Sequence, residues 1–409
     1  MVAVRIIRAC KDLGFATVTV YDDADIWAPH AGLADEAYAL AGAGYEDVES
    51  LIAVALRSGA DAVHPGDGRL ALDVAAAAAV RGRGLLWIGA SVDRPARRPP
   101  ASAQQGRGLD EGPVQRAHVD LLAGAARAVA LGARIVAVSR RGIPVAAHSA
   151  PRDAAAELAE RAHAIAGNLG IQGYGVAEFE RRQGGDWQFL GVSARLTPEH
   201  AVVEEQSGVD IVTAQIALAF NAGAPLPQAV RDFWAFGFAV EAEDRARGAL
   251  RAAGVVRSFQ LPSGPGVRVD SALGEGQVIV PSRDNRLAFV TISASTETQA
   301  RERLPRAAGE ISVRGVTTAV WLPGAAGPAD PEFTDVAPDT GVVELEVRRG
   351  GTAVRLAFRL TRLRNLHGAH HPANSAAGGG RLTPTPVAAR PGRAGTSASS
   401  GSVRIPHPA

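Results

Sequence analysis

The sequence predicts an α/β fold that begins with a parallel, doubly wound sheet. Two observations carry this prediction: helical and strand patterns alternate over residues 1–91, and short turns punctuated by glycine separate them. Strand-rich stretches follow from about residue 116, so strands and helices share most of the chain. A length of 409 residues is enough for two or three domains.

The first block opens with a helical pattern, because Ile6, Cys10 and Leu13 share a face and Gly14 suits the C-terminal cap. In such sheets ligands bind at the carboxyl ends of strands, and His64 lies near the carboxyl end of an expected strand, which makes it a candidate cofactor-binding residue. The rest of the block is expected to contain a strand over 15–23, a helix over 46–58, a strand over 61–66, an alanine-rich helix over 69–82 and a strand over 85–89.

The later blocks are separated by changes in composition. Residues 92–115 are rich in Pro, Gly, Arg and Gln, a composition that predicts a linker. Farther along the chain, Pro305 interrupts a helix expected over 296–308, which would lower the stability of the helix by about 3 kcal/mol. A β-hairpin extension is expected over 326–365, turning at 350–351, and a disordered tail over 366–409. The block over 116–230 is expected to hold strands near 117–123, 134–138, 175–179 and 187–192 and helices over 152–169 and 209–221, and short strands dominate 231–325.

The composition argues against several functional classes. The formal net charge of +1 disfavours binding to nucleic acid or to a membrane surface through bulk charge. A single cysteine, Cys10, excludes a disulfide framework and a cysteine-based zinc site within one chain. The sequence contains no stretch of about 18 apolar residues, so no membrane-spanning helix is expected. The first residues lack the pattern of a signal peptide, and a cytoplasmic protein is expected.

A polar cluster lies in "VSARLTPEH", residues 192–200, directly after the apolar, β-prone run "DWQFLGV". It contains Arg195, Glu199 and His200, residue types that bind anions and move protons, and it is expected where a buried strand ends. Gly191 and Ser193 come just before it, where a metal site would need hard oxygen ligands. The alternative reading is a strand-end salt bridge between Arg195 and Glu199, with His200 in a packing or hydrogen-bonding role.

Separate motifs along the chain resemble, in order and spacing, biotin carboxylases, the ATP-grasp components of biotin-dependent acyl-CoA carboxylases. They include "RIIRACKDLGFATVTVYDDAD", "GADAVHPGDG", "WIGAS", "HVDLLAG", "RRGIPVAAHSAP", "IQGYGVAEF", "ARLTPEHAVVEEQSGVDIVTAQIALAF", "GFAVEAED" and "LPSGPGVRVDSALGEGQVIVPSRDN". The resemblance covers about residues 2–325. It implies a Rossmann-like pre-ATP-grasp domain over 1–91, a partial ATP-grasp domain over 116–230 whose lid is replaced by the linker 92–115, and a mostly-β biotin carboxylase C-terminal domain over 231–325.

The reaction that this resemblance implies is ATP-dependent carboxylation of biotin by bicarbonate, in an acyl-CoA carboxylase of fatty acid metabolism. Arg195 falls on the arginine that holds bicarbonate, and Glu199 on the catalytic glutamate that takes its proton. Arg268, in "GPGVRVD", falls on the arginine that stabilises the negative charge developing on biotin. These three residues are the expected catalytic group.

On the nucleotide side the resemblance implies ATP and Mg²⁺ as cofactors, with Glu178 as a metal-binding carboxylate and His64 and His118 as cofactor-binding residues. The family's second metal carboxylate falls on Gly191, and its asparagine partner on Ser193. Glycine offers no side-chain oxygen, and serine is a poor ligand for Mg²⁺. We therefore expect a degenerate active site that is impaired in ATP binding.

Other departures point in the same direction. A lysine of the family's bicarbonate-side loop falls near Pro144, the glycine-rich lid that covers the phosphates is missing, and Asp67 and Arg69 replace aromatic residues. Because Lys11 is the only lysine, the chain is not expected to carry biotin on itself. The expected partners are a biotin carrier domain on another chain and a carboxyltransferase subunit, and the resemblance also implies a homodimer.

Alternatives stay open at the level of the sequence. The chain can be a non-catalytic relative of the carboxylases that acts as a binding or partner protein, or a degraded gene product without a stable function. A dinucleotide site at Asp22 and Asp23 is disfavoured because no Gly-x-Gly-x-x-Gly turn precedes the strand. The three histidines within 367–371 indicate adventitious rather than functional metal binding.

Overall fold

The computed structural model describes residues 1–40, 44–90, 114–124, 128–138, 144–182, 185–221, 223–244, 247, 250–281 and 285–322, and the strand segments 334–336, 342–349 and 352–359. The described residues all belong to one compact unit, Met1–Leu363. The predicted tail and histidine cluster, the hairpin turn and nearly all of the predicted linker lie outside the described residues.

The N-terminal part contains two pairs of parallel strands, β1 with β2 and β3 with β4, in agreement with the predicted α/β fold class. In the described residues the two pairs form separate two-stranded sheets and not the single doubly wound sheet that was expected. The helix expected over 69–82 is divided, because the Asp73 carboxylate accepts hydrogen bonds from the N–H groups of Ala75 and Ala76 and starts a new helix there. The elements are α1 (Val2–Asp12), β1 (Val18–Tyr21), η1 (Asp23–Asp25), α2 (Pro29–Leu33), β2 (Glu36–Ala39), α3 (Val48–Ser58), β3 (Ala62–Val63), η2 (Arg69–Leu72), α4 (Val74–Gly82) and β4 (Leu86–Trp87).

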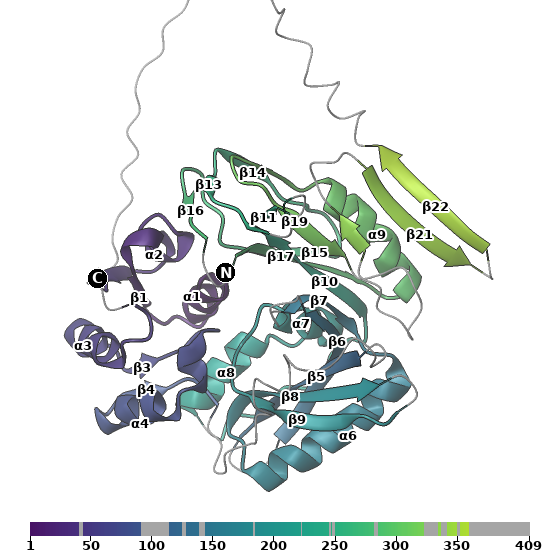
Figure 1. Cartoon of the computed structure of the whole chain (residues 1–409). Coiled ribbons are helices and arrows are strands. Elements are labelled where there is room, and N and C mark those ends of the chain that lie inside the picture. Colours follow the sequence, from purple (N-terminus) through teal and green to yellow (C-terminus); the bar gives the residue numbers. More distant parts are fainter. Residues whose placement is uncertain are drawn as a thin grey trace, which may run out of the picture. The chain divides into compact units, whose positions relative to one another are not determined.

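A large antiparallel sheet dominates the rest of the described unit (Figure 1). Its strands run in the order β15-β17-β10-β7-β6-β5-β8-β9, so it continues without a break from the middle of the chain into its C-terminal part. The middle elements are β5 (Val114–Ala123), β6 (Ala128–Val138), β7 (Pro144–Ser149), α6 (Arg152–Leu169), β8 (Gly173–Arg182), β9 (Gln188–Ser193), α7 (His200–Ser207) and α8 (Ile211–Phe220).

The C-terminal part adds short strands and one helix. β21 and β22 pair antiparallel along their full length, as the sequence predicts for the hairpin. Helix α9 runs through Pro305, so the expectation that proline interrupts this helix is wrong. The elements are β10 (Trp234–Glu241), β11 (Glu243–Asp244), β12 (Leu250–Arg251), β13 (Gly254–Val255), β14 (Ser258–Gln260), β15 (Val267–Ser271), β16 (Val278–Ile279), β17 (Arg286–Ala294), α9 (Glu297–Gly309), β18 (Ser312–Arg314), β19 (Ala319–Leu322), β20 (Thr334–Val336), β21 (Val342–Arg349) and β22 (Thr352–Arg359).

Helices cover both faces of the large sheet. One face carries α6 over β5 and β6 and α9 over β10 and β17, with buried residues such as Leu158 and Leu304 facing the strands. The other face carries α7 and α8. Helix α7 lies very close to the strands, since a Cβ added at Gly237 of β10 would come within 2.8 Å of Val202 and 2.5 Å of Phe289. Of the predicted site residues, Arg195 and Glu199 lie shortly before the first residue of α7.

Within the described part of the chain, every helix is too short or too polar to cross a membrane.

Candidate functional site

Three predicted positions form a row across neighbouring strands. His118 on β5 lies opposite Glu178 on β8, and Glu178 lies opposite Gly191 on β9. Directly opposed residues of an antiparallel pair project to the same face, so the row shares one side of the sheet. Burial holds the pKa of His118 well below its ordinary range, and the nearby charges of Arg134, Arg116 and Arg195 lower it further. The His118 ring is therefore neutral.

Arg195 lies in the connection between β9 and α7, where its backbone N–H donates to the Ser193 hydroxyl at 3.4 Å. Its guanidinium is half-buried and close enough to His118 to act on that ring electrostatically. It makes no ion pair with any residue that the structure describes. The strand-end salt bridge between Arg195 and Glu199, offered above as the alternative, is therefore wrong.

Glu199 occupies the N-cap position of α7 and is fully buried. Its Oε1 accepts a hydrogen bond from Nη1 of Arg286, the first residue of β17, at 3.3 Å. Its Oε2 is also buried, and no described residue offers it a hydrogen bond. Arg286 reaches a second carboxylate as well, with Nη2 at 3.6 Å from Oδ2 of Asp67.

Arg268 on β15 is held by carboxylates. Its Nε donates to Asp270 at 2.9 Å, and its Nη1 donates to Glu204 and lies 4.0 Å from Glu205. Burial lowers the pKa of Arg268, but Glu204 and Asp270 outweigh this effect and raise the pKa above its ordinary value. The remaining Nη2 is buried and has no hydrogen-bond partner among the residues described.

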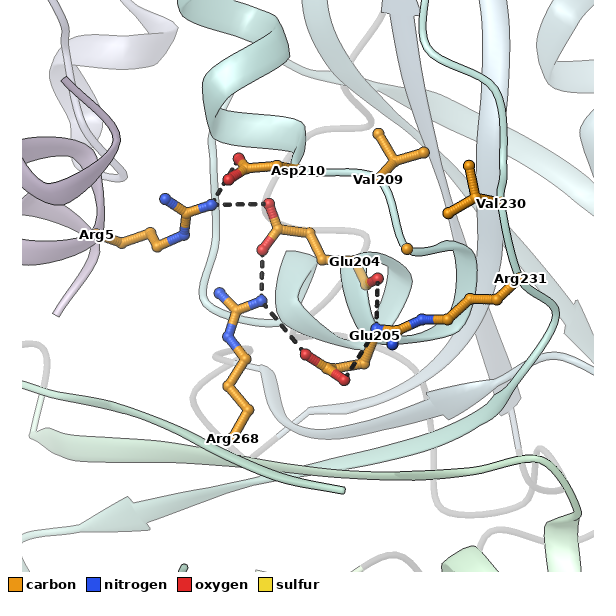
Figure 2. A pocket seen from close by; sticks show the side chains of 9 residues that line it. Arg5, Glu204, Glu205, Val209, Asp210, Val230, Arg231 and Arg268 are labelled. Carbon is orange, nitrogen blue, oxygen red and sulfur yellow. Dashed lines mark hydrogen bonds and ion pairs between the residues drawn. The ribbon is translucent and has the colours of Figure 1, made fainter. Parts of the chain in front are cut away.

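Glu204, which the sequence analysis did not single out, is the centre of an ion-pair network. Figure 2 shows Arg5 from α1 and Arg268 from β15 pointing toward it. The Arg5 Nη2 lies 3.4 Å from Glu204 and 2.6 Å from Asp210, and the Ile211 N–H at the start of α8 donates to Glu204 at 2.7 Å. A pocket of about 290 Å³ opens beside the network, lined by Arg5, Glu204, Glu205, Gly208, Val209, Asp210, Val230, Arg231 and Arg268.

The two histidines near the site have structural partners. His200 Nδ1 donates to the Thr197 carbonyl at 2.8 Å, and burial lowers its pKa, which fits the packing role given as its alternative. His64 Nδ1 accepts from the Gly66 N–H at 3.0 Å, and its Nε2 lies 3.2 Å from Oε1 of Gln215. Burial lowers the pKa of His64 to about 4. Both nitrogens of His64 are used within the chain, and its contact with a cofactor stays a prediction.

The sequence analysis also missed a buried cluster of three polar side chains on β5, β6 and β8. Asp120 on β5 forms an ion pair with Arg134 on β6 and accepts a hydrogen bond from the Tyr174 hydroxyl, and all three side chains are fully buried. Burial raises the pKa of Tyr174 to about 12, and the charges of Glu199 and Glu204 act in the same direction.

The described residues do not fit a two-carboxylate metal site. Glu178 faces Gly191, which has no side-chain oxygen, and Ser193 stands opposite Val176. Nowhere in the described ranges do three His, Cys, Asp or Glu side chains come together to hold a metal. Mg²⁺ requires near-ideal coordination by oxygen ligands, and Glu178 and Ser193 alone do not supply it.

Three family models match the chain. "Biotin carboxylase, N-terminal domain" matches residues 1–94, and "Carbamoyl-phosphate synthase L chain, ATP binding domain" matches residues 143–229. "Biotin carboxylase C-terminal domain" matches residues 238–345.

Curated relatives agree with these matches. The chain is similar to the biotin-dependent acyl-coenzyme A carboxylase alpha3 subunit of Mycobacterium leprae, with 31% identity covering 78% of this chain and 68% of the relative. It is also similar to biotin carboxylase 1 of Bacillus subtilis, with 27% identity over 412 residues, covering 78% of this chain and 91% of the relative. The alignment with biotin carboxylase 1 spans 412 positions but uses only 78% of this chain, so some residues of that relative have no counterpart in this chain.

Solved structures share the fold. The biotin carboxylase domain of Hydrogenobacter thermophilus 2-oxoglutarate carboxylase, solved as a dimer with MgADP, ADP and bicarbonate, matches with a TM-score of 0.69 and 22% identity, covering 78% of this chain and 89% of that one. Rhizobium etli pyruvate carboxylase matches with a TM-score of 0.68 and 27% identity, covering 78% of this chain and 35% of that one. These likenesses confirm the predicted fold class. Together with the 31% identical relative, they show that this chain belongs to the biotin carboxylase family.

Proposed function

We propose that the chain is a biotin carboxylase-type subunit of an acyl-CoA carboxylase that keeps the bicarbonate and biotin side of its site and is impaired in ATP binding. The observation that carries this proposal is the state of Glu199. One carboxylate oxygen is held by Arg286, and the other is buried without a hydrogen-bond partner among the described residues. A buried acceptor without a partner is costly, and a proton donor such as bicarbonate would satisfy it.

The neighbouring cations suit the same substrate. The Arg195 guanidinium is half-buried and makes no ion pair within the described residues, so it is available to a small anion. In this proposal Arg195 holds bicarbonate, and Glu199 Oε2 takes the proton from its hydroxyl group. The unused Nη2 of Arg268 supplies a donor for charge that develops on the ureido oxygen of biotin.

The nucleotide side lacks comparable support. Glu178 stands opposite Gly191, and Pro144 begins the strand near which the family places a lysine. Clustered phosphate charges need cations or metal ions to compensate them. We therefore propose weak or absent binding of Mg-ATP, with Glu178 and His118 as remnants of the cofactor site rather than working ligands.

The proposed partners follow from the chemistry. Lys11 is the only lysine of the sequence, and its ammonium group lies 3.0 Å from the Asp35 carboxylate. We propose that biotin reaches the site on a carrier domain of another chain, that a carboxyltransferase subunit completes the reaction, and that the chain forms a homodimer. The bulk charge gives no support for a nucleic-acid or membrane partner.

The test is a pair of titrations on the purified chain. Calorimetry with Mg-ATP is expected to give no measurable heat at micromolar concentrations, whereas ¹³C-bicarbonate is expected to bind and to lose affinity in Glu199→Gln. A micromolar dissociation constant for Mg-ATP would contradict the proposed impairment. Bicarbonate binding that is absent, or that Glu199→Gln leaves unchanged, would contradict the proposed site.

A second candidate is a non-catalytic relative that acts as a binding or partner protein, and the observation that favours it is the pairing of Glu178 with Gly191. This candidate predicts co-purification with a carboxyltransferase or a biotin carrier, without bicarbonate-dependent ATP hydrolysis in the presence of free biotin. ATP hydrolysis above that of Glu199→Gln would exclude it.

A further inference from the structure

Arg286 lies between two carboxylates that come from distant parts of the chain. Its Nη1 is 3.3 Å from Oε1 of Glu199, and its Nη2 is 3.6 Å from Oδ2 of Asp67. The Arg286 side chain is only 7% exposed and Glu199 is 0% exposed, so solvent screens their attraction much less than on the surface. This chain of charges joins the N-terminal part, the start of α7 and the start of β17.

Both ring nitrogens of His64 help to hold the loop that carries Asp67. The Gly66 N–H donates to Nδ1 of His64, and Nε2 of the same ring contacts Gln215 on α8. Gly66 has φ of 68°, which a residue with a side chain adopts only with strain. The position of Asp67 beside Arg286 is therefore set by the fold of the loop and does not depend on Arg286 alone.

We propose that Arg286 is a positioning residue for Glu199 and that Asp67 holds Arg286 in place. The inference rests on the proposed function, in which Glu199 takes the bicarbonate proton. A glutamate side chain has several rotamers, and an ion pair to one oxygen selects among them. Arg286 binds Oε1 and so leaves Oε2 as the oxygen that faces substrate, while its positive charge compensates the buried carboxylate.

The test measures the affinity for ¹³C-bicarbonate at pH 8 by NMR titration, in the full chain, without nucleotide. Arg286→Met is expected to weaken binding about tenfold, since it removes a hydrogen bond between two charged groups and water recovers only part of that interaction. The double variant Arg286→Met with Glu199→Gln is expected to bind no more weakly than Glu199→Gln alone, because Arg286 acts only through Glu199. Arg286→Lys is expected to recover part of the affinity.

A matched control separates positioning from a general effect on folding. Arg301 on α9 is another partly buried arginine, paired with Glu297 at 2.8 Å, and Arg301→Met is expected to lower the melting temperature without changing the bicarbonate affinity. Asp67→Asn keeps the pair between Arg286 and Glu199 and is expected to weaken binding by about threefold, less than Arg286→Met.

The outcomes distinguish this inference from the proposed function. A wild-type chain that binds no bicarbonate overturns both. If the wild-type chain binds bicarbonate, two results overturn the positioning role alone. One is an unchanged affinity in Arg286→Met, and the other is a loss of affinity in the double variant that equals the sum of the two single losses. Should Arg286→Met fail to fold, wild-type affinity in both Arg286→Lys and Asp67→Asn would overturn it instead.

Discussion

Glu178 on β8 and Gly191 on β9 are directly opposed in an antiparallel pair, so that a carboxylate faces a position without a side chain. The two Cβ positions of such a pair lie about 5 Å apart, which is close enough for both side chains to bind one ion. In the proposed function, this pairing leaves one carboxylate where a metal site would need two.

Restoring the missing carboxylate tests this interpretation. Gly191→Glu, combined with Ser193→Asn, is expected to raise the affinity for Mn²⁺ at least tenfold, because the metal then meets two opposed carboxylates and an amide oxygen. Gly191 is not among the glycines with positive φ, so the backbone accepts a side chain there. Electron paramagnetic resonance of free Mn²⁺ measures the binding.

The control for this prediction is Gly191→Gln with Ser193→Asn, which adds the same volume without the charge. Without metal, the glutamate variant is expected to melt below the glutamine variant, since like charges directly opposite each other are destabilising. Mn²⁺ should remove that difference. Equal affinity of the two variants for Mn²⁺ would show that Glu178 is not part of a restorable metal site.

A second prediction concerns Glu204, whose carboxylate forms ion pairs with Arg5 and Arg268 and accepts hydrogen bonds from the first N–H groups of α8. Glu204→Gln is expected to lower the free energy of unfolding by about 2 to 3 kcal/mol, because it removes the buried carboxylate that Arg5 and Arg268 share. Urea denaturation measures the change. Its neighbour Glu205 is 20% exposed and pairs with the more exposed Arg231, so Glu205→Gln is expected to cost less than about 1 kcal/mol. Equal losses in the two variants would contradict the central role of Glu204.

Much of the fold could be predicted from the sequence, because local patterns and local structure agree. The helix predicted over 152–169 is α6, ended by Gly170 at φ of 62°, and the hairpin and most strands also lie where expected. Helix α7 was missed because nearly all of its residues are buried on every side, which removes the helical alternation of polar and apolar residues. Strand β7 was missed because a short stretch with three small residues has no clear period.

The site could be predicted only in part. Arg195 and Glu199 were found because they are close together in a motif, whereas the partners that hold Glu199 and Arg268 were not. Arg286 is 87 residues from Glu199, and Arg268 is 64 residues from Glu204. Pairs at such separations are made by the sheet, whose order β15-β17-β10 brings both arginines to α7, and no local pattern records that order.

A third prediction is a loss of stability in mild acid. Burial lowers the pKa values of His64 and His148 to about 4, from an ordinary value near 6.5. Between these values the unfolded chain binds more protons than the folded chain, so stability is full above about pH 6.5 and falls as the pH drops toward 4. Each pKa unit corresponds to about 1.4 kcal/mol.

Urea denaturation at pH 7.5, 6 and 5 measures this effect. His64→Gln and His148→Gln are each expected to flatten the pH dependence, because neither replacement has a ring to protonate. His163, which is exposed on α6, provides the control variant His163→Gln. A decline in stability that is as steep in both buried variants as in the wild type would show that other groups cause it.

The final prediction concerns Pro305, which lies inside α9 although proline has no N–H to donate to the preceding turn. Helix α9 survives because Leu304, Ala300 and Ala307 are buried against the strands, and this packing offsets the local cost. Pro305→Ala is therefore expected to raise the free energy of unfolding by about 1 to 3 kcal/mol. Pro265 lies in an exposed turn, so Pro265→Ala is expected to be neutral or slightly destabilising, because it only frees the unfolded chain. If Pro305→Ala were no more stable than Pro265→Ala in urea denaturation, the helix would accommodate its proline without cost, contrary to this account.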